Sequence, residues 1–123
     1  MWWTLLAVWT IVILGITVLP LANFVGHSHW DQVDWIPFHI DRLDFYDIVG
    51  NVAMFVPFGY FLRRAVRVRS RKLAWALILV FAAGLATGLE FYQVFCHNRI
   101  PSATDIISNF FGAIIGAAIS EST

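Results

Sequence analysis

The chain has 123 residues, a usual length for one domain, so a single domain over residues 1–123 is expected. It is 59% apolar and 13% charged, whereas soluble domains are about 45–50% apolar and about 25% charged, so the composition argues against a soluble protein. The formal net charge of zero gives no basic excess for nucleic-acid binding, and a single cysteine, Cys96, excludes an intrachain disulfide.

Four apolar segments are predicted to cross a membrane as helices, since a span needs about 20 mostly apolar residues. The first, residues 3–22, carries no charge and lacks the basic start and the cleavage site of a signal peptide, so it is predicted to be a retained span. The second, residues 46–62, is less apolar because it contains Asp47, Asn51 and Pro57. The third and fourth are residues 73–95 and 105–119.

The charges are unevenly placed along the chain. Six of the eight basic residues fall between Arg63 and Lys72, and five of the eight acids fall between Asp31 and Asp47. Basic loops stay cytoplasmic, so the connection between the second and third spans is predicted inside, where it contacts anionic lipid headgroups. The expected fold class is therefore all-α, a polytopic membrane protein whose four transmembrane helices form a bundle with both termini inside (N-in/C-in).

On this topology, polar residues of three spans meet at one depth below the outer surface. Residues four or three apart share a helix face, and ionisable residues within spans rarely face lipid, so these side chains are expected to turn inward. Arg99 lies in the short loop that joins two of the spans. The predicted ligand-binding cluster consists of Asp47, Asn51, Glu90, Gln93, Arg99, Asp105 and Asn109.

This cluster has two interpretations. In the first, Arg99 bridges Glu90 and Asp105 and the network only fixes helix register. In the second, three acids exceed one arginine, so protonation, water or a bound cation must balance the charge, and the site suits a polyhydroxyl or amine-bearing ligand better than a bare phosphate. Glu90, Asp105 and Arg99 are also the candidate catalytic residues if the acids work as acid and base. The sequence leaves open whether the protein is an enzyme.

Local patterns predict caps and close helix contacts. Thr104, directly before Asp105, is predicted to be a helix N-cap. Small-residue pairs four apart, which let helix backbones approach, are expected to hold the third and fourth spans together. These pairs are Gly84 with Gly88, and Gly112 with Gly116.

The first outer loop is rich in histidine, aspartate and aromatic residues. Its aromatic residues are predicted to form an interfacial belt, and its aspartates a solvated face. His27 and His29 with Asp31 match a metal site weakly, because no third histidine stands at a known spacing, so neither a metal nor a cofactor is predicted. The residues concerned are Trp30, Trp35, Phe38, Phe45 and Tyr46 for the belt, and Asp31, Asp34, Asp41 and Asp44 for the solvated face.

Two motifs resemble the VanZ-like family. DIVGNVAMFVPFGYFL, residues 47–62, resembles its N-x-x-x-F-x-P-F-G pattern, and residues 88–116 resemble its E-x-x-Q…R…D…N-x-x-G pattern. With IPF at residues 36–38, the resemblance covers about residues 36–118. It places the family signature on Asn51, Pro57, Phe58, Gly59, Glu90, Gln93, Arg99, Asp105, Asn109 and Gly112.

The resemblance implies a small multi-pass protein of the bacterial inner (cytoplasmic) membrane, within the cell envelope. The member that gives the family its name is associated with low-level resistance to the glycopeptide antibiotic teicoplanin. Beside membrane lipid, the expected ligand is a lipid-linked precursor, a lipid headgroup or a glycopeptide-like molecule. The alternatives are an intramembrane hydrolase or transferase, and a structural or assembly protein. The ligand's identity and the oligomeric state do not follow from the sequence.

Overall fold

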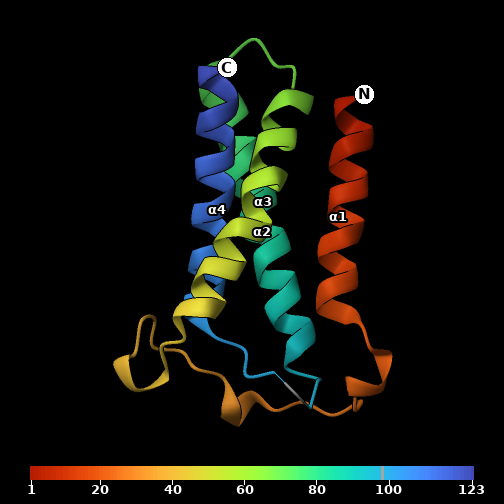
Figure 1. Cartoon of the computed structure of the whole chain (residues 1–123), viewed down its shortest axis with the longest axis vertical. Coiled ribbons are helices and arrows are strands. Elements are labelled where there is room, and N and C mark those ends of the chain that lie inside the picture. The colour runs from red at the N-terminus through yellow and green to blue at the C-terminus, as the bar shows by residue number, and fades with distance from the viewer. Residues whose placement is uncertain (98) are drawn as a thin grey trace.

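The computed structural model describes residues 1–97 and 99–123, which form four α-helices (Figure 1). Helix α1 spans Trp2–Val18, α2 spans Phe45–Ala65, α3 spans Arg71–Gln93 and α4 spans Ala103–Ser122. The long connection between α1 and α2 contains three 3-10 turns, η1 (Leu21–Asn23), η2 (Trp30–Gln32) and η3 (Ile40–Arg42). The described residues form no β-strand, so the predicted all-helical fold is confirmed.

The helix lengths differ from the predicted spans. Helices α2, α3 and α4 are long and apolar enough to cross a membrane, whereas α1 is apolar but has 17 residues. The predicted first span was too long because the helix stops before Pro20, and Leu19 takes the extended backbone that proline imposes on its predecessor. The fourth was too short, since α4 has 20 residues. Helix α3 starts two residues before the predicted span and ends two residues before its end, and α2 continues to Ala65.

Side-chain caps fix where three of the helices begin. Asp44 accepts a hydrogen bond from the Tyr46 amide, and Ser70 caps α3 in the same way. At α4 the cap is Ser102, whose Oγ accepts from the Asp105 amide at 3.1 Å. The prediction of Thr104 as the N-cap was therefore wrong. Helix α4 begins two residues earlier than the sequence pattern indicated, which places Thr104 within its first turn.

Helices α2 and α4 form the closest helix pair of the bundle. A Cβ atom added at Gly59 would overlap the backbone of Ala113, and one added at Gly116 would overlap the backbone of Val56. A Cβ atom added at Gly112 would also overlap α2, at the backbone of Val52. Three glycines on two helices therefore let the two backbones touch directly.

The predicted partner of these glycines was wrong. Gly112 and Gly116 face α2 and not α3, while Gly84 and Gly88 have nothing within 4 Å of an added Cβ. A small-residue pair allows a close approach but does not specify which helix approaches. The partner is set by Gly59, which gives α2 a matching flat surface.

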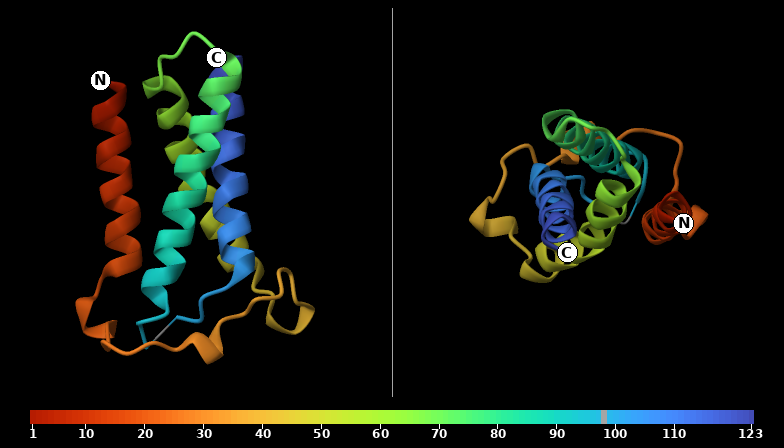
Figure 2. Two further views of the ribbon diagram at one scale, coloured as in Figure 1. Left: turned by 180° about the vertical axis from the view of Figure 1, so that it is seen from behind. Right: turned by 90° about the horizontal axis from the view of Figure 1, so that it is seen from above.

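Helix α1 stands to one side of the other three helices when the bundle is viewed along its length (Figure 2). It packs mainly on α2 and buries two of its residues, Leu6 and Ile13. The indole nitrogen of Trp9 also donates a hydrogen bond of 2.8 Å to the Met54 carbonyl of α2. Helix α1 is therefore the most loosely held of the four.

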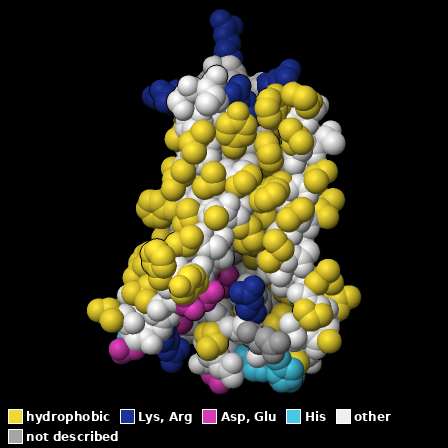
Figure 3. All heavy atoms as spheres, viewed as in Figure 1, with side chains coloured by type: hydrophobic (Ala, Val, Ile, Leu, Met, Phe, Trp, Pro, Cys, Tyr) yellow, Lys and Arg dark blue, Asp and Glu magenta, His cyan; other side chains and the backbone are white. Residues whose placement is uncertain are grey.

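Charged side chains gather at the two ends of the bundle, with an apolar band between them (Figure 3). We call one end, where α2 and α4 finish and α3 begins, the arginine end, since it carries six basic side chains and one acid, Glu121. We call the opposite end the acidic end, since it carries seven acids and two arginines, Arg42 and Arg99. The apolar band suits contact with lipid tails.

The glycine contact predicts a contrast between two alanine substitutions. We expect Gly116→Ala to lower the free energy of unfolding by about 1–3 kcal/mol, because its methyl group overlaps the α2 backbone. Gly88→Ala, also in a helix but with open space around it, should be neutral or stabilise by up to about 1 kcal/mol. Melting temperatures in detergent measure both. Equal losses for the two variants would contradict the packing described here.

The charge asymmetry predicts that the arginine end is cytoplasmic. In a Cys96→Ser background, a cysteine introduced by Ser70→Cys should not react with a membrane-impermeant thiol reagent added to intact cells. Asp41→Cys in the same background is the matched control, since Asp41 is exposed at the acidic end and should be labelled. Labelling at position 70 and not at position 41 would show that the bundle has the opposite orientation in the membrane.

Candidate functional site

The acidic end is closed by the long α1–α2 connection, which is hydrogen-bonded to the α3–α4 connection. The Val25 amide donates to the Phe95 carbonyl at 2.9 Å. Farther along, the Asp34 amide donates to the Pro101 carbonyl and the Ala103 amide donates to the Asp34 carbonyl, both at 2.9 Å. Asp34 was predicted to belong to a solvated face, but this pairing holds it, half-buried, against the start of α4.

Thr104 fastens the same connection to α4. Its Oγ1 accepts a hydrogen bond of 2.8 Å from the amide of Phe38, a residue with φ of 56°. The left-handed backbone at Phe38 is unfavourable for a bulky side chain and needs support from its surroundings. Thr104 is buried and supplies part of that support.

Two histidines of this connection, His27 and His29, face backbone carbonyls. The rings of His27 and His29 lie 4.7 Å apart, and their Nδ1 atoms lie near the carbonyls of Val25 and Val94. Within residues 1–97 and 99–123, no group of three or more His, Cys, Asp or Glu side chains is arranged to hold a metal ion. The weak metal pattern in the sequence therefore finds no matching geometry.

Two neighbouring cavities lie at the acidic end and share three lining residues, Asp47, Gln93 and Arg99. The first has a volume of about 750 Å³ and is also lined by Asp44 and Asp105. The second has a volume of about 430 Å³ and extends between α1 and the other helices. It is lined by the other members of the predicted cluster, Asn51, Glu90 and Asn109, so the structure brings all seven residues together.

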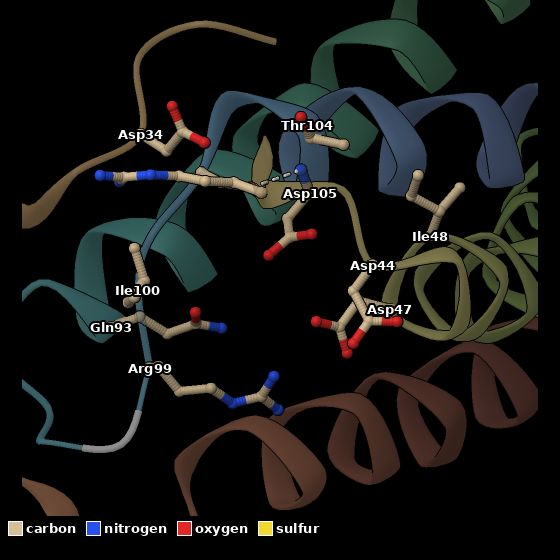
Figure 4. Close-up of a pocket in the computed structure, with 11 residues that line it drawn as sticks. Asp34, Asp44, Asp47, Ile48, Gln93, Arg99, Ile100, Thr104 and Asp105 are labelled. Carbon is tan, nitrogen blue, oxygen red and sulfur yellow. Dashed lines mark hydrogen bonds between the residues drawn. The ribbon is translucent and has the colours of Figure 1, made fainter. Parts of the chain in front are cut away.

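The side chains around the first cavity point toward a common space (Figure 4). The Asp47 and Asp105 carboxyls approach it from α2 and α4, the Gln93 amide from α3, and the Arg99 guanidinium from the α3–α4 connection. Figure 3 shows acidic and basic side chains in a recess of the surface at this end. The site therefore combines buried amides with charged groups that water can reach.

Glu90 joins the end of α3 to the start of α4. Its side chain is buried, and its Oε2 accepts a hydrogen bond of 2.9 Å from the Ser102 amide. The predicted bridge from Arg99 to Glu90 and Asp105 is absent, since both ion pairs found among the described residues belong to Glu121. The Ser102 amide already serves Glu90, and Arg99 lies exposed at the rim of the site.

Asn51 and Asp105 connect α2 to α4. The Asn51 amide nitrogen donates to Asp105 Oδ1 at 2.8 Å. On α4 this bond lies two turns before Gly112, the first of the two α4 glycines that contact the α2 backbone. The close helix contact therefore sets the separation at which this polar pair can form.

Gln93 and Asn109 are buried but lack partners for their amide oxygens. Their exposed fractions are 6% and 2%. Neither Gln93 Oε1 nor Asn109 Oδ1 has a hydrogen-bond donor among the described residues, and both side chains line the second cavity. Most buried polar atoms in native proteins are paired, so two unpaired acceptors beside one cavity require an explanation such as bound water or a ligand.

Three loop residues that line the first cavity, Asp34, Arg42 and Asp44, were not predicted as site residues from the sequence. Asp44 lines it and also caps α2, while Asp34 and Arg42 reach it from the long connection. Asp44 was recognisable as an N-cap, because it directly precedes the second apolar segment. Asp34 and Arg42 carry no such signal, since the path of a long irregular loop leaves no periodic pattern in the sequence.

Comparison with known families gives one result that covers nearly the whole chain. The model of the family described as VanZ/LLP1 matches residues 2–122. Comparisons with curated proteins and with solved structures gave no match.

The Glu90–Ser102 bond predicts a difference between two substitutions at position 90. Glu90→Gln keeps an oxygen that can accept from the Ser102 amide, so we expect nearly unchanged stability. Glu90→Ala leaves that amide unpaired and should lower the free energy of unfolding by about 1–3 kcal/mol. Thermal unfolding in detergent tests both variants. An equally large loss for Glu90→Gln would mean that the charge itself holds the fold.

Proposed function

The chain belongs to the VanZ/LLP1 family, and we propose that it is a multi-pass membrane protein that binds the polar head of an envelope-related amphipathic ligand at its acidic end. The ligand classes that fit are a lipid-linked precursor, a lipid headgroup and a glycopeptide-like molecule. The proposed location is the bacterial cytoplasmic membrane, with the acidic end facing outward.

The observation that carries this proposal is the pair of unpaired buried oxygens on Gln93 and Asn109. Leaving a buried acceptor without a donor costs about 1–3 kcal/mol, so the site gains when a ligand supplies N–H or O–H groups. Carboxyl groups of Asp47 and Glu90 line the same cavity, and that of Asp105 lines the neighbouring one. This surplus of acceptors favours a ligand rich in hydroxyl, amine or amide donors.

The shape of the second cavity favours a ligand with an apolar part. Beside the polar cluster, it is lined by Trp9 and Ile16 of α1 and by Ala53 and Met54 of α2. Since α1 packs loosely on one side of the bundle, we expect the cavity between α1 and α2 to open toward lipid. A lipid chain in this space would place its head among the acceptors.

A purely structural role fits part of the cluster. The Asn51–Asp105 and Glu90–Ser102 hydrogen bonds each join two helices or their ends, as a register-fixing network requires. Gln93, Asn109 and Arg99 do not fit this role, because the amide oxygens of Gln93 and Asn109 have no donor and Arg99 forms no ion pair with a described residue, while all three line the second cavity. Ligand binding accounts for both groups of residues.

An intramembrane hydrolase or transferase is the second candidate. Glu90 and Asp105 would serve as acid and base, and Arg99 would stabilise developing negative charge. In its favour, Glu90 accepts through Oε2 and Asp105 through Oδ1 in the hydrogen bonds described above, and both carboxyls line the cavities. If the protein is such an enzyme, Glu90→Gln should retain binding and abolish turnover.

The proposal predicts that Asn109→Leu separates binding from folding. Leucine has a similar size and removes an unpaired polar group, so the free energy of unfolding should stay unchanged or rise by up to about 2 kcal/mol. Ligand binding should be lost. The probes are phosphatidylethanolamine, a polyprenyl-phosphate-linked amino sugar and teicoplanin, scored by the rise in melting temperature and by native mass spectrometry of the purified chain.

A second variant, at the rim of the site, and two contradicting outcomes complete this test. Arg99→Ala should weaken binding of any probe that stabilises the wild type, without unfolding the chain, because Arg99 is exposed. If Asn109→Leu instead destabilises the fold strongly, the cluster is structural. If no probe stabilises the wild type and no lipid co-purifies with it, the binding proposal fails.

A further inference from the structure

The arginine end holds a cavity of its own, far from the acidic end. It has a volume of about 640 Å³ and lies where the α2–α3 connection meets the last turn of α4. Four arginines and three residues at the end of α4 supply its polar lining. These are Arg63, Arg64, Arg67, Arg71, Ser120, Glu121 and Thr123.

The charges lining this cavity are not balanced. Glu121 accepts from Arg63 Nε at 3.0 Å, from Arg71 Nη2 at 2.8 Å and from Trp75 Nε1 at 3.1 Å, so both its oxygens are occupied. Among the lining side chains, one carboxylate faces four guanidinium groups, which leaves a surplus of three positive side-chain charges. Arg67 is exposed and makes no hydrogen bond or ion pair with any residue that the structure describes.

Two buried polar atoms at this cavity lack partners. Ser120 is 5% exposed and lines the cavity, and its Oγ has no hydrogen-bond partner among the described residues. Arg64 Nε is likewise buried without an acceptor. A hydroxyl and a guanidinium N–H can both donate, so this end needs acceptors, whereas the acidic end needs donors.

Arg64 is also held in place before any ligand arrives. Its guanidinium lies over the rings of Trp2 and Tyr60, at 5.6 and 5.5 Å from their centres. Its Nη2 donates to Thr123 Oγ1 at 2.6 Å. A guanidinium fixed in this way loses little freedom on binding and is suited to planar contacts with an oxyanion.

We propose that this cavity is a phosphate-binding site, which takes either the phosphate of an anionic lipid headgroup or a free phosphate. Several arginine donors and one serine hydroxyl provide the charge-assisted hydrogen bonds that phosphate oxygens accept. A basic loop that acts only as a topology signal requires charge near the membrane and no more. It does not account for a cavity with a buried, unpaired serine.

The test compares two cavity variants with a variant of equal charge outside the cavity. Binding to the purified full chain in detergent is followed by melting temperature against short-chain phosphatidylglycerol, phosphatidylcholine of the same chain length, and inorganic phosphate. We expect phosphatidylglycerol to stabilise the wild type, and Ser120→Ala and Arg67→Gln each to weaken its binding about tenfold or more. Arg69→Gln removes the same charge as Arg67→Gln, but Arg69 does not line the cavity, so binding should change little.

The outcomes are distinct. If Arg67→Gln and Arg69→Gln weaken binding equally and Ser120→Ala has no effect, the attraction is diffuse and the site is refuted. Absence of stabilisation by both phosphatidylglycerol and inorganic phosphate also refutes it. Ser120-dependent binding of inorganic phosphate identifies the free ion as sufficient, and Ser120-dependent binding of phosphatidylglycerol alone identifies a lipid headgroup.

Discussion

The direct contact between the α2 and α4 backbones is the constraint on which the acidic end depends. Gly59, Gly112 and Gly116 remove the side chains that would keep the two helices apart. Two turns of α4 from this contact, Asn51 and Asp105 come within hydrogen-bonding distance, because the helices are still close together there. Helix α3 is joined to the start of α4 by the hydrogen bond that the Ser102 amide donates to Glu90, so α2, α3 and α4 all contribute side chains to the site.

The two ends of the bundle carry unpaired buried groups of opposite kinds, acceptors at the acidic end and donors at the arginine end. At the acidic end, buried amide oxygens of Gln93 and Asn109 lack donors, and at the arginine end, the buried Arg64 Nε and Ser120 hydroxyl lack partners. Unpaired polar atoms are costly in the interior of a protein and costlier beside lipid. Their confinement to the cavity linings, together with well-packed caps and helix contacts elsewhere, favours binding sites over imperfect folding.

Much of the fold and of the candidate site was predictable from the sequence because lipid imposes strong rules. Apolar length predicted the helices, and the avoidance of lipid by ionisable groups predicted that Asp47, Glu90 and Asp105 would meet. Choices between chemically equivalent partners were not predictable. Gly112 could have faced either neighbouring helix, and Glu90 could have paired with Arg99 or with a backbone amide. The contributions of Asp34 and Arg42 depend on the path of a loop whose hydrogen bonds join backbone to backbone, which side-chain patterns do not encode.

The separation of charge between the ends also couples the protein to the membrane potential. Six basic groups against one acid give the arginine end a formal side-chain charge of +5, and seven acids against two arginines give the acidic end a formal −5, with histidines counted as neutral and all acids as ionised. Moving one charge through 100 mV takes about 2.3 kcal/mol, so inverting both ends against such a potential would take roughly 23 kcal/mol. In the predicted orientation, a membrane potential that is negative inside therefore stabilises the orientation of the bundle, whether or not either site is occupied.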